Sequence, residues 1–403
     1  MSVTSLEFLI PLFAGSAIFT LLQGLWVRRV FLTLCSAGFL WFQGPDATHV
    51  LTLLAFVLSG YVAARLLVWR PSAVVLALYI VGLTVAFVIL KRYAFLTLVG
   101  GESLLAQGLD LVGLSFIFFR QIHYVVDVKQ GEIRKLDLWT YLCYQLNLFT
   151  LLAGPIQRYQ RFEEDWQSLK PLPEDAHAVR MAMLRILIGV IKVSFIGEWC
   201  LHIATTSLDL PPMVQRVLLF YLFPAYVFLN FAGYCDIVIA GASLAGIRVP
   251  ENFDRPYLAR NMIDFWSRWH RTLSFWIRDY VFTPLYMAIA RRRADWAPNL
   301  AFLCYFVALT LAGIWHGSSW NFVVFGVLNG LGVSAAKLWE NVIVSRSGRK
   351  GLRAYLNNRP IKWLAIFVTV NFVCVTQIFL RPGSEDNIAA VVRAITSMLG
   401  GGV

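Results

Sequence analysis

The sequence of 403 residues contains few charged side chains: Asp, Glu, Lys and Arg together make up 14% of it. Soluble domains carry about a quarter of charged residues. This shortage excludes an ordinary soluble enzyme, because a soluble domain of this length needs a polar surface over its apolar core.

Several short motifs of well-known enzyme classes are also absent. The sequence contains no GxxxxGK loop followed by Ser or Thr, which excludes ATP hydrolysis at a P-loop, and no GxSxG elbow of the kind serine hydrolases use. It contains no CxxC pair and no group of His and Cys with the spacing of metal ligands. We therefore expect no metal site and interpret the six cysteines as buried thiols.

Apolar residues are what the sequence has in excess. They make up 58% of the chain, and the mean hydropathy is +0.65. Runs long enough to cross a bilayer recur along the whole length, and the run 217–235 contains no charged residue. Because a backbone in lipid must satisfy its own hydrogen bonds, these runs predict an all-α polytopic membrane protein.

Run length and loop charge predict about ten membrane crossings. The expected spans are 7–25, 30–43, 48–67, 72–92, 107–127, 181–205, 213–247, 299–315, 319–341 and 361–380. We expect one membrane-embedded domain over 1–403, with peripheral helices in 1–106, a catalytic core in 107–382 and an amphipathic surface helix in 383–403.

The net charge of +12 indicates an excess of Lys and Arg. In a membrane protein this excess lies in cytoplasmic loops and faces anionic headgroups, so nucleic acid is not an expected partner. The clusters Lys129–Lys135, Arg291–Arg293 and Arg346–Lys362 then mark the cytoplasmic side and place both termini outside; Lys91 and Arg92 fit this scheme poorly. No Lys or Arg precedes the first apolar run, so we expect that run to be retained rather than cleaved as a signal peptide.

Two stretches depart from the pattern of simple crossings. Residues 138–156 are apolar but have basic residues at both ends, which predicts a re-entrant segment turned near Gly154 and Pro155. Residues 250–298 are rich in Trp, Arg and His and predict amphipathic helices in or near the cytoplasmic interface. Irregular backbone at membrane depth survives only where it lines a cavity, so both stretches indicate a functional site.

His316 is the sharpest candidate for chemistry. It stands where a charge-free apolar run meets the Gly317-Ser318-Ser319 break. An ionisable side chain within the membrane is costly and is usually functional, and a desolvated imidazole stays neutral near pH 7, as a general base must. The alternative is a histidine that bonds a neighbouring carbonyl and only fixes packing.

His270 is the second candidate, within residues 265–280. If this segment is one helix, Trp266, Trp269 and Leu273 share one face, and Arg268, Arg271 and Arg278 share another. An aromatic face beside a basic one suits an acyl or phosphate-bearing donor that arrives from the cytoplasm. The alternative is an aromatic belt whose arginines contact lipid headgroups.

Two further ionisable residues lie in apolar surroundings. His123 is next to Tyr124 and could face the same cavity. Asp236 lies within a long apolar run and needs a partner, such as one of the arginines, and we expect that pairing to be structural.

The arrangement of these motifs resembles the membrane-bound O-acyltransferase family, in the bacterial branch that acts on alginate and on teichoic acids. The resemblance covers about 110 to 382. It rests on Pro250–Arg260, Phe265–His270, Leu273-Ser274, Arg278–Tyr280 and Ile314–Gly317, and further upstream on Gly113–Ser115, Tyr124 with Asp127, Ala153–Ile156 with Arg158, and Gly233-Tyr234 with Asp236.

The resemblance implies a ring of tilted helices around a central tunnel. A donor would enter from the cytoplasm and an acceptor hydroxyl from outside, meeting at the family histidine that His316 matches, with His270 as the second functional histidine. We assign substrate binding to residues near these two: Trp266, Trp269, Arg268, Arg278, Asp279, Trp315 and Ser274. No bound cofactor is expected, because the donor is itself an activated thioester, either acetyl-CoA or an acyl carrier protein.

The resemblance leaves the acyl group open. Our first expectation is acetyl transfer to an envelope or secreted polysaccharide at the bacterial inner membrane, with an extracytoplasmic partner protein. The alternative is D-alanyl transfer from a carrier-protein thioester, since the chain length is near that of the D-alanyl branch. A transporter or flippase could use the same histidines along a path, but the internal repeats typical of transporters are not visible in the sequence. His316 as a base and His316 as an acyl-accepting nucleophile both remain possible.

Overall fold

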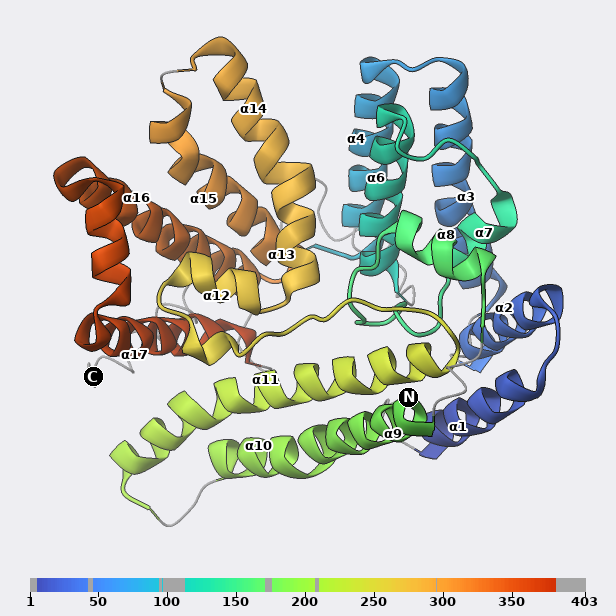
Figure 1. The fold of residues 1–403 in the computed structure, drawn as a ribbon, viewed down its shortest axis with the longest axis horizontal. Coiled ribbons are helices and arrows are strands. Elements are labelled where there is room, and N and C mark those ends of the chain that lie inside the picture. The colour runs from blue at the N-terminus through green and yellow to red at the C-terminus, as the bar shows by residue number, and fades with distance from the viewer. Residues whose placement is uncertain are drawn as a thin grey trace. The chain divides into compact units, whose positions relative to one another are not determined.

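The computed structural model describes residues 6–42, 46–93, 96, 113–170, 176–206, 210–294 and 296–381. Within these ranges every regular element is a helix (Figure 1). The chain divides into two compact units: the first comprises Met1–Arg92, Leu96–Phe195 and Asn230–Glu251, and the second comprises Tyr93–Phe95, Ile196–Leu229 and Asn252–Val403. The surface helix expected over 383–403 lies outside the described residues.

The first unit packs around the buried helix α6. Its helices are α1 (Leu6–Leu21), α2 (Leu25–Phe42), α3 (Ala47–Trp69), α4 (Ala73–Leu90), α6 (Leu114–Gln130), α7 (Leu138–Gln145), α8 (Tyr159–Gln167) and α9 (Ala176–Val190). Helices α3, α4 and α6 lie side by side (Figure 1). Gly60 of α3 permits this approach, because a Cβ there would collide with the Tyr141 hydroxyl and the Gln121 amide.

The second unit holds the Trp-rich stretch and the helices that follow it. Its elements are α10 (Glu198–Thr205), η3 (Pro256–Leu258), α12 (Met262–Arg268), α13 (Arg271–Ile277), η4 (Arg278–Phe282), α14 (Thr283–Arg292), α15 (Ala297–His316), α16 (Trp320–Asn357), α17 (Arg359–Gln377) and η5 (Ile378–Leu380). Two elements are divided between the units: η2 (Ile191–Gly197), which continues α9 as a π-helix, and α11 (Pro212–Leu244).

Among the residues that the structure describes, six helical stretches are long and apolar enough to cross a membrane: α2, α3, α4, α11, α16 and Arg359–Leu380. Two shorter apolar stretches, Glu7–Leu21 and Leu300–His316, lie in α1 and α15. Each of the ten spans expected from the sequence contains a helix, and eight of the ten coincide with these stretches. The other two, 107–127 and 181–205, fall on α6 and on α9 to α10, which are not among them.

Both stretches expected to be irregular contain short helices and turns. Over 138–156 the structure has only the eight-residue helix α7 followed by turns, which is too short to cross a bilayer. Asp137 starts α7, since its carboxylate accepts from the backbone N–H of Thr140 at 2.7 Å. Over 250–298 the chain forms the short elements η3 and α12, and after His270 the elements α13, η4 and α14 follow one another without a break as one helical stretch from Arg271 to Arg292, with η4 as a π-helical turn inside it.

Helices α15 and α16 form a closely packed hairpin (Figure 1). A Cβ added to Gly326 would lie 2.7 Å from the carbonyl oxygen of Thr310 and 2.9 Å from the Cα of Gly313. Glycine at these positions lets the two backbones touch, as small residues do between membrane helices. The hairpin turn follows directly after His316 and so fixes where that residue stands.

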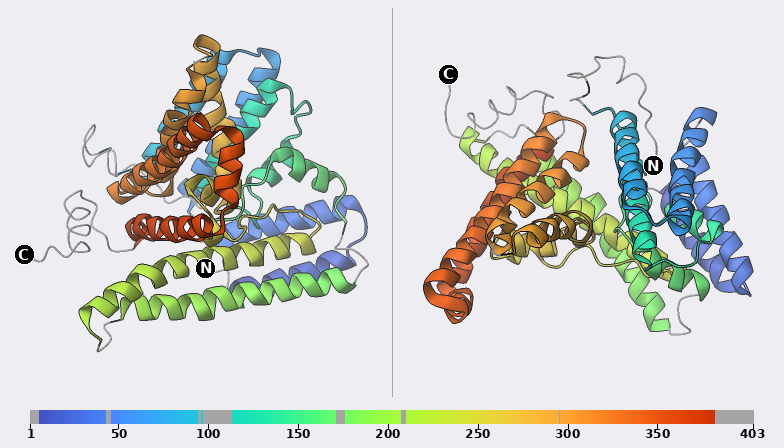
Figure 2. Two further views of the ribbon diagram at one scale, coloured as in Figure 1. Left: turned by 60° about the vertical axis from the view of Figure 1, so that its left-hand side comes forward. Right: turned by 90° about the horizontal axis from the view of Figure 1, so that it is seen from above.

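Helix α16 breaks near its far end. Gly348 has φ of 66°, in the left-handed region, so the residues after it run in a new direction. Figure 2 shows this turn from two further sides, at the red end of α16 before α17 begins. Asn358 then starts α17, because its side-chain oxygen accepts from the backbone N–H of Ile361.

Candidate active site

His316 is the last residue of α15 and is half-buried. Its ring centre lies 4.9 Å from that of Trp315 and 5.7 Å from that of Phe325, which meets it edge-on at 89°. The ring centre of His270 is 6.4 Å away. Both sequence-predicted histidines and Trp315 therefore gather at one place within the second unit.

His270 connects α12 to α13 and is only 1% exposed. Its φ of 43° is left-handed, which is uncommon for a residue with a side chain. The segment 265–280 is not one helix, since α12 ends at Arg268 and α13 starts at Arg271, so the shared face considered for Trp266, Trp269 and Leu273 does not form. The helix breaks because the backbone on both sides of His270 bonds to another segment: Asp254 N–H donates to Arg268, and Arg271 N–H donates to Asn252.

Asn252 holds the His270 ring and was not singled out by sequence reasoning. Its Oδ1 accepts from the Thr272 hydroxyl at 2.8 Å and the Thr272 N–H at 3.3 Å, which fixes that atom as the carbonyl oxygen. The same oxygen lies 3.1 Å from His270 Nδ1, so Nδ1 carries the proton and Nε2 is the ring's acceptor. No local pattern could have found this contact, because the two residues are 18 apart.

The environment of His270 keeps its imidazole neutral. His270 belongs to none of the six helical stretches that could cross a membrane. Burial, and secondarily the neighbouring His316, lower the pKa of His270 well below its ordinary range. A neutral ring with a defined acceptor nitrogen can accept a hydrogen bond, or a proton, from a hydroxyl group.

The predicted tryptophans pack on this unit's interior. Trp269 is 6% exposed and stacks on Phe265 with ring centres 5.6 Å apart. Trp266 is 7% exposed and meets Phe325, the same ring that contacts His316. Phe325 thus contacts both Trp266 and His316, and Phe265 connects Trp266 to the aromatic cluster around Trp269. The members of that cluster are Phe228, Phe253, Tyr257 and Phe265.

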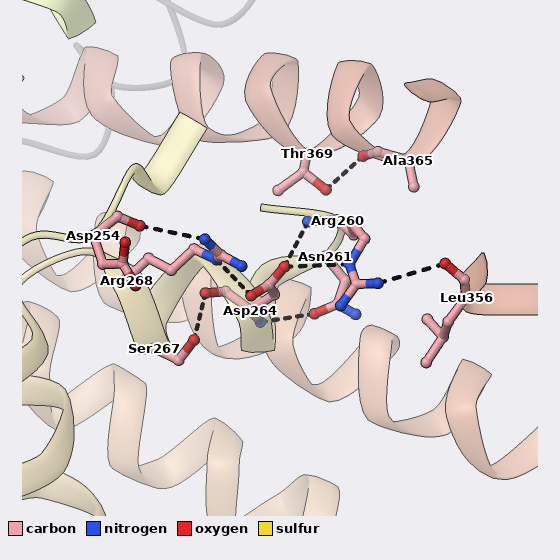
Figure 3. Close-up of polar contacts among 9 residues, drawn as sticks. All are labelled: Asp254, Arg260, Asn261, Asp264, Ser267, Arg268, Leu356, Ala365 and Thr369. Carbon is pink, nitrogen blue, oxygen red and sulfur yellow. Dashed lines mark hydrogen bonds and ion pairs between the residues drawn. The ribbon is translucent and has the colours of Figure 1, made fainter. Parts of the chain in front are cut away.

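The predicted polar residues Arg268, Arg278, Asp279 and Ser274 occupy different settings. Arg268 pairs with Asp264 at 2.7 Å, and this hydrogen bond raises the pKa of the guanidinium (Figure 3). Arg278 and Asp279 are more exposed and form an ion pair at 2.9 Å. The Ser274 hydroxyl donates to the carbonyl of Trp269 at 3.3 Å. Arg268 therefore stabilises the local fold, and Arg278 and Asp279 offer charge at the surface.

Asp264 is the hub that holds α12 in place, as Figure 3 shows. Besides Arg268, it accepts from the backbone N–H of Arg260 at 3.0 Å. Its own N–H donates to the side chain of Asn261, which caps the helix. The Arg260 side chain extends from this hub to the carbonyl of Leu356 at the end of α16.

His123 and Asp236 belong to the first unit. His123 Nε2 accepts from the N–H of Tyr159 at 2.8 Å, and its Nδ1 lies 3.3 Å from the Asp127 carboxylate. The prediction that an arginine pairs with Asp236 is confirmed: Arg185 Nε lies 2.9 Å from one oxygen of Asp236. Lys192 Nζ lies 2.7 Å from the other. These contacts give both residues a place in the packing of their unit.

Sequence reasoning also missed Arg120, a cation that is 1% exposed inside the first unit. Its guanidinium donates to the carbonyls of Tyr144, Gln145 and Thr150. These bonds connect the end of α7 and the turn after it to α6. The available signal was a lone arginine directly after the apolar run 114–119, and the contacts lie 24 to 30 residues further along the chain.

Comparison with known proteins decides the family. The model of the membrane-bound O-acyltransferase family, MBOAT, matches residues 12–378. The chain belongs to this family. It is accordingly an O-acyltransferase and a multi-pass membrane protein, as the resemblance of its motifs predicted.

The similar proteins act on different polymers. A teichoic acid D-alanyltransferase of Streptococcus thermophilus is 30% identical over 293 residues, which are 69% of this chain and 68% of that protein. The Bacillus subtilis protein of the same name is 29% identical over 66% of this chain and 67% of its own length. A probable alginate O-acetylase of Azotobacter vinelandii is 27% identical over 69% of this chain, but this covers about half of its own length, 52%.

Proposed function

We propose that this O-acyltransferase moves a short acyl group, with acetyl as the first candidate, from a thioester donor on the cytoplasmic side to hydroxyl groups of a polysaccharide outside the bacterial inner membrane. The observation that carries the proposal is the pair of imidazoles in the second unit, whose centres are 6.4 Å apart. Two imidazoles this close together can act on the same hydroxyl group.

In the proposed reaction His316 is the general base. It takes the proton from the acceptor hydroxyl while that oxygen attacks the thioester carbonyl, so a C–O bond forms and the C–S bond breaks. The thiolate then leaves with the proton that His316 returns. A positioned base of this kind contributes roughly 10²–10⁴-fold in rate. His270, with Nδ1 bonded to Asn252, presents Nε2 as a second acceptor to the same hydroxyl.

The donor is a substrate in this proposal, and no bound cofactor is needed because a thioester is already activated. Acetyl-CoA or an acyl carrier protein would supply it from the cytoplasm. Trp266 and Trp315, which neighbour the histidines, would contact the acyl group, and the more exposed Arg278 and Asp279 would contact the polar part of the donor. An extracytoplasmic polysaccharide-modifying protein would deliver or receive the acceptor.

D-Alanyl transfer from a carrier-protein thioester to an envelope polymer is the second candidate. One observation favours it: the D-alanyltransferases named above match this chain over about two thirds of their length, whereas the alginate O-acetylase matches over about half. The two candidates share the base and differ in the acyl group, so one experiment separates them.

The test is to replace His316 by Ala in the producing cell and to measure ester-linked acetate and ester-linked D-alanine on the envelope polymers. We expect one of the two esters to fall by at least about 10²-fold, and the ester that falls identifies the acyl group. His202→Ala is the matched control, because His202 is an exposed histidine of the same unit whose Nδ1 lies 3.2 Å from the Thr206 hydroxyl.

Normal content of both esters, with the variant inserted in the membrane at normal level, would reject His316 as the base. The base and nucleophile mechanisms are separated by acid-quenching the enzyme with labelled donor alone, since label retained on the His316 peptide indicates an acyl-histidine intermediate.

A further inference from the structure

A strongly basic segment comprises the last part of α16 and the first residues of α17, and it plays no part in the proposed reaction. Residues 346–362, which we call the basic foot, carry only positive charge. Its six cations are Arg346, Arg349, Lys350, Arg353, Arg359 and Lys362. No Asp or Glu occurs in the sequence between Glu340 and Glu385. All six side chains are exposed, and in the part of the chain that the structure describes none of them forms an ion pair.

The basic foot departs from the path of the spanning helix. Residues 320–347 alone would extend about 42 Å as a helix, more than the ~30 Å hydrocarbon core of a bilayer. The break at Gly348 then turns the chain. The short helical stretch after it ends at Asn357, and α17 begins at Arg359 (Figure 1). The foot is therefore the turn between two membrane-crossing helices, at the level where they leave the hydrocarbon.

The side chains of both helices change in the same order towards the foot. On α17, exposed Phe367 and Leu364 are followed by Trp363, which is 62% exposed, and then by Lys362, whose Nζ lies 5.8 Å from the Trp363 ring centre. On α16, exposed Leu331 is followed by exposed Leu338 and by Trp339, which is 55% exposed, beside the ion pair of Lys337 with Glu340, and then by the arginines. Apolar, aromatic and cationic layers in that order match hydrocarbon, interface and headgroup of a membrane.

We propose that the basic foot is a binding site for anionic phospholipid headgroups. Six unpaired cations within 17 residues, next to the ends of two spanning helices, fit the phosphates of a membrane surface. The exposed tryptophans select a lipid over an acidic protein as the occupant, since their rings continue the lipid-facing surface of the helices without a break.

The foot is also joined to the helix before His270. Arg260 donates from Nη1 to the carbonyl of Leu356 at 3.4 Å, while its backbone N–H bonds Asp264 of α12 (Figure 3). Headgroups bound at the basic foot would therefore stabilise the segment around Leu356, whose carbonyl accepts the hydrogen bond from Arg260. The proposal concerns binding, and its test does not depend on acyl transfer.

The experiment uses the full chain in phosphatidylcholine vesicles that contain a photoactivatable lipid, either phosphatidylglycerol or phosphatidylcholine with the reactive group near the phosphate. Crosslinked peptides are identified by mass spectrometry. We expect residues 346–362 to be labelled on the order of tenfold more by the anionic probe than by the zwitterionic one, and this preference to fall at high salt.

Variants separate charge from fold. The triple variant Arg349→Gln, Lys350→Gln and Arg353→Gln is expected to lose the preference, and Arg349→Lys with Arg353→Lys is expected to keep it. The matched control removes the same charge elsewhere, by Lys129→Gln, Arg134→Gln and Lys135→Gln, and is expected to label the foot as the original chain does.

Equal labelling by the two probes, or an unchanged preference in the triple Gln variant, would overturn the proposal. So would protection of 346–362 by an added acidic acyl carrier protein in vesicles where the anionic probe labels no better than the zwitterionic one, because that result assigns the surface to a protein.

Discussion

At the scale of single residues, the orientation of the His270 ring depends on Asn252. Asn252 is 1% exposed and uses one carbonyl oxygen to hold both Thr272 and the Nδ1–H of His270. This bond determines which imidazole nitrogen can accept a proton. Asn252 is therefore a positioning residue, and its role can be separated from that of a merely structural asparagine.

Replacing Asn252 by Ala is expected to lower kcat about tenfold with little change in KM, because the loss of one hydrogen bond of about 1 kcal/mol frees the wrong tautomer. Asn252→Asp keeps an acceptor at Oδ1 but adds a negative charge, which raises the pKa of His270 from its lowered value. Protonated His270 has no acceptor at Nε2. The acid limb of the pH–rate profile should therefore move to higher pH in Asn252→Asp.

The measurement is the pH profile of acyl transfer by purified protein. Asn371→Ala is the control, because Asn371 is an exposed asparagine that bonds Tyr221 in the same unit. An Asn252→Asp profile that superimposes on the original would show that the bond does not set the state of His270.

Both histidines could be predicted from the sequence, whereas their partners could not. His316 stands out because an imidazole in an apolar run is costly wherever the chain folds, and His270 stands out because it lies among Trp and Arg residues. Asn252 and Phe325 are ordinary residues in sequence, and only folding brings them to the rings. The free-energy cost of placing an ionisable side chain in apolar surroundings can be estimated from the neighbouring sequence. The residues that the side chain contacts depend on the tertiary structure.

At the scale of elements, the hairpin of α15 and α16 places His316. Glycines at 313 and 326 let the backbones meet, and the hairpin turn begins one residue after the histidine. A change that separates the helices would shift the end of α15 relative to Phe325, which lies beside Gly326 in the chain. Packing of this hairpin should therefore control both stability and activity.

Gly326→Ala is expected to lower the thermal unfolding midpoint and the rate of acyl transfer together. Its Cβ would lie 2.7 Å from the Thr310 carbonyl oxygen, closer than real contacts allow, so the helices must move apart. Gly82→Ala on α4 is the control, because its Cβ would meet nothing within 4 Å, and it should be neutral or stabilise by up to about 1 kcal/mol. The checks are unfolding in detergent and activity of both variants, and a Gly326→Ala protein with the original midpoint would contradict the packing argument.

Helix positions were predictable, and helix breaks were not. Hydropathy located a helix in each expected span because length and apolar content suffice for that. The single helix considered over 265–280 does not form, because Asn252 and Asp254 bond to backbone groups on either side of His270. The break at Gly348 was likewise not foreseen, since an isolated glycine in a basic stretch carries no directional signal.

At the scale of the whole molecule, composition alone indicated a polytopic membrane protein, and family membership agrees with it. Cysteine usage follows the expectation as well: all six are free, five are buried, and Cys35 is partly exposed. The sidedness of the loops rests on the distribution of Lys and Arg, and it remains a prediction that the chain itself allows to be tested.

The basic clusters predict that residues 129–135, 291–293 and 346–362 face the cytoplasm, whereas the connection after α10 faces outside. Single cysteines placed at Lys135, Arg292 and Ser347 on a Cys35→Ser background should react with a membrane-impermeant maleimide only after the cells are opened. A cysteine at Thr206, which is exposed at the end of α10, should react in intact cells. The remaining native cysteines are buried and should not react with the maleimide. Labelling of the Cys35→Ser protein without added cysteines checks this. Labelling at Ser347 in intact cells would put the basic foot outside, where the thioester donor of the proposed reaction is absent, and would reverse the orientation on which that reaction depends.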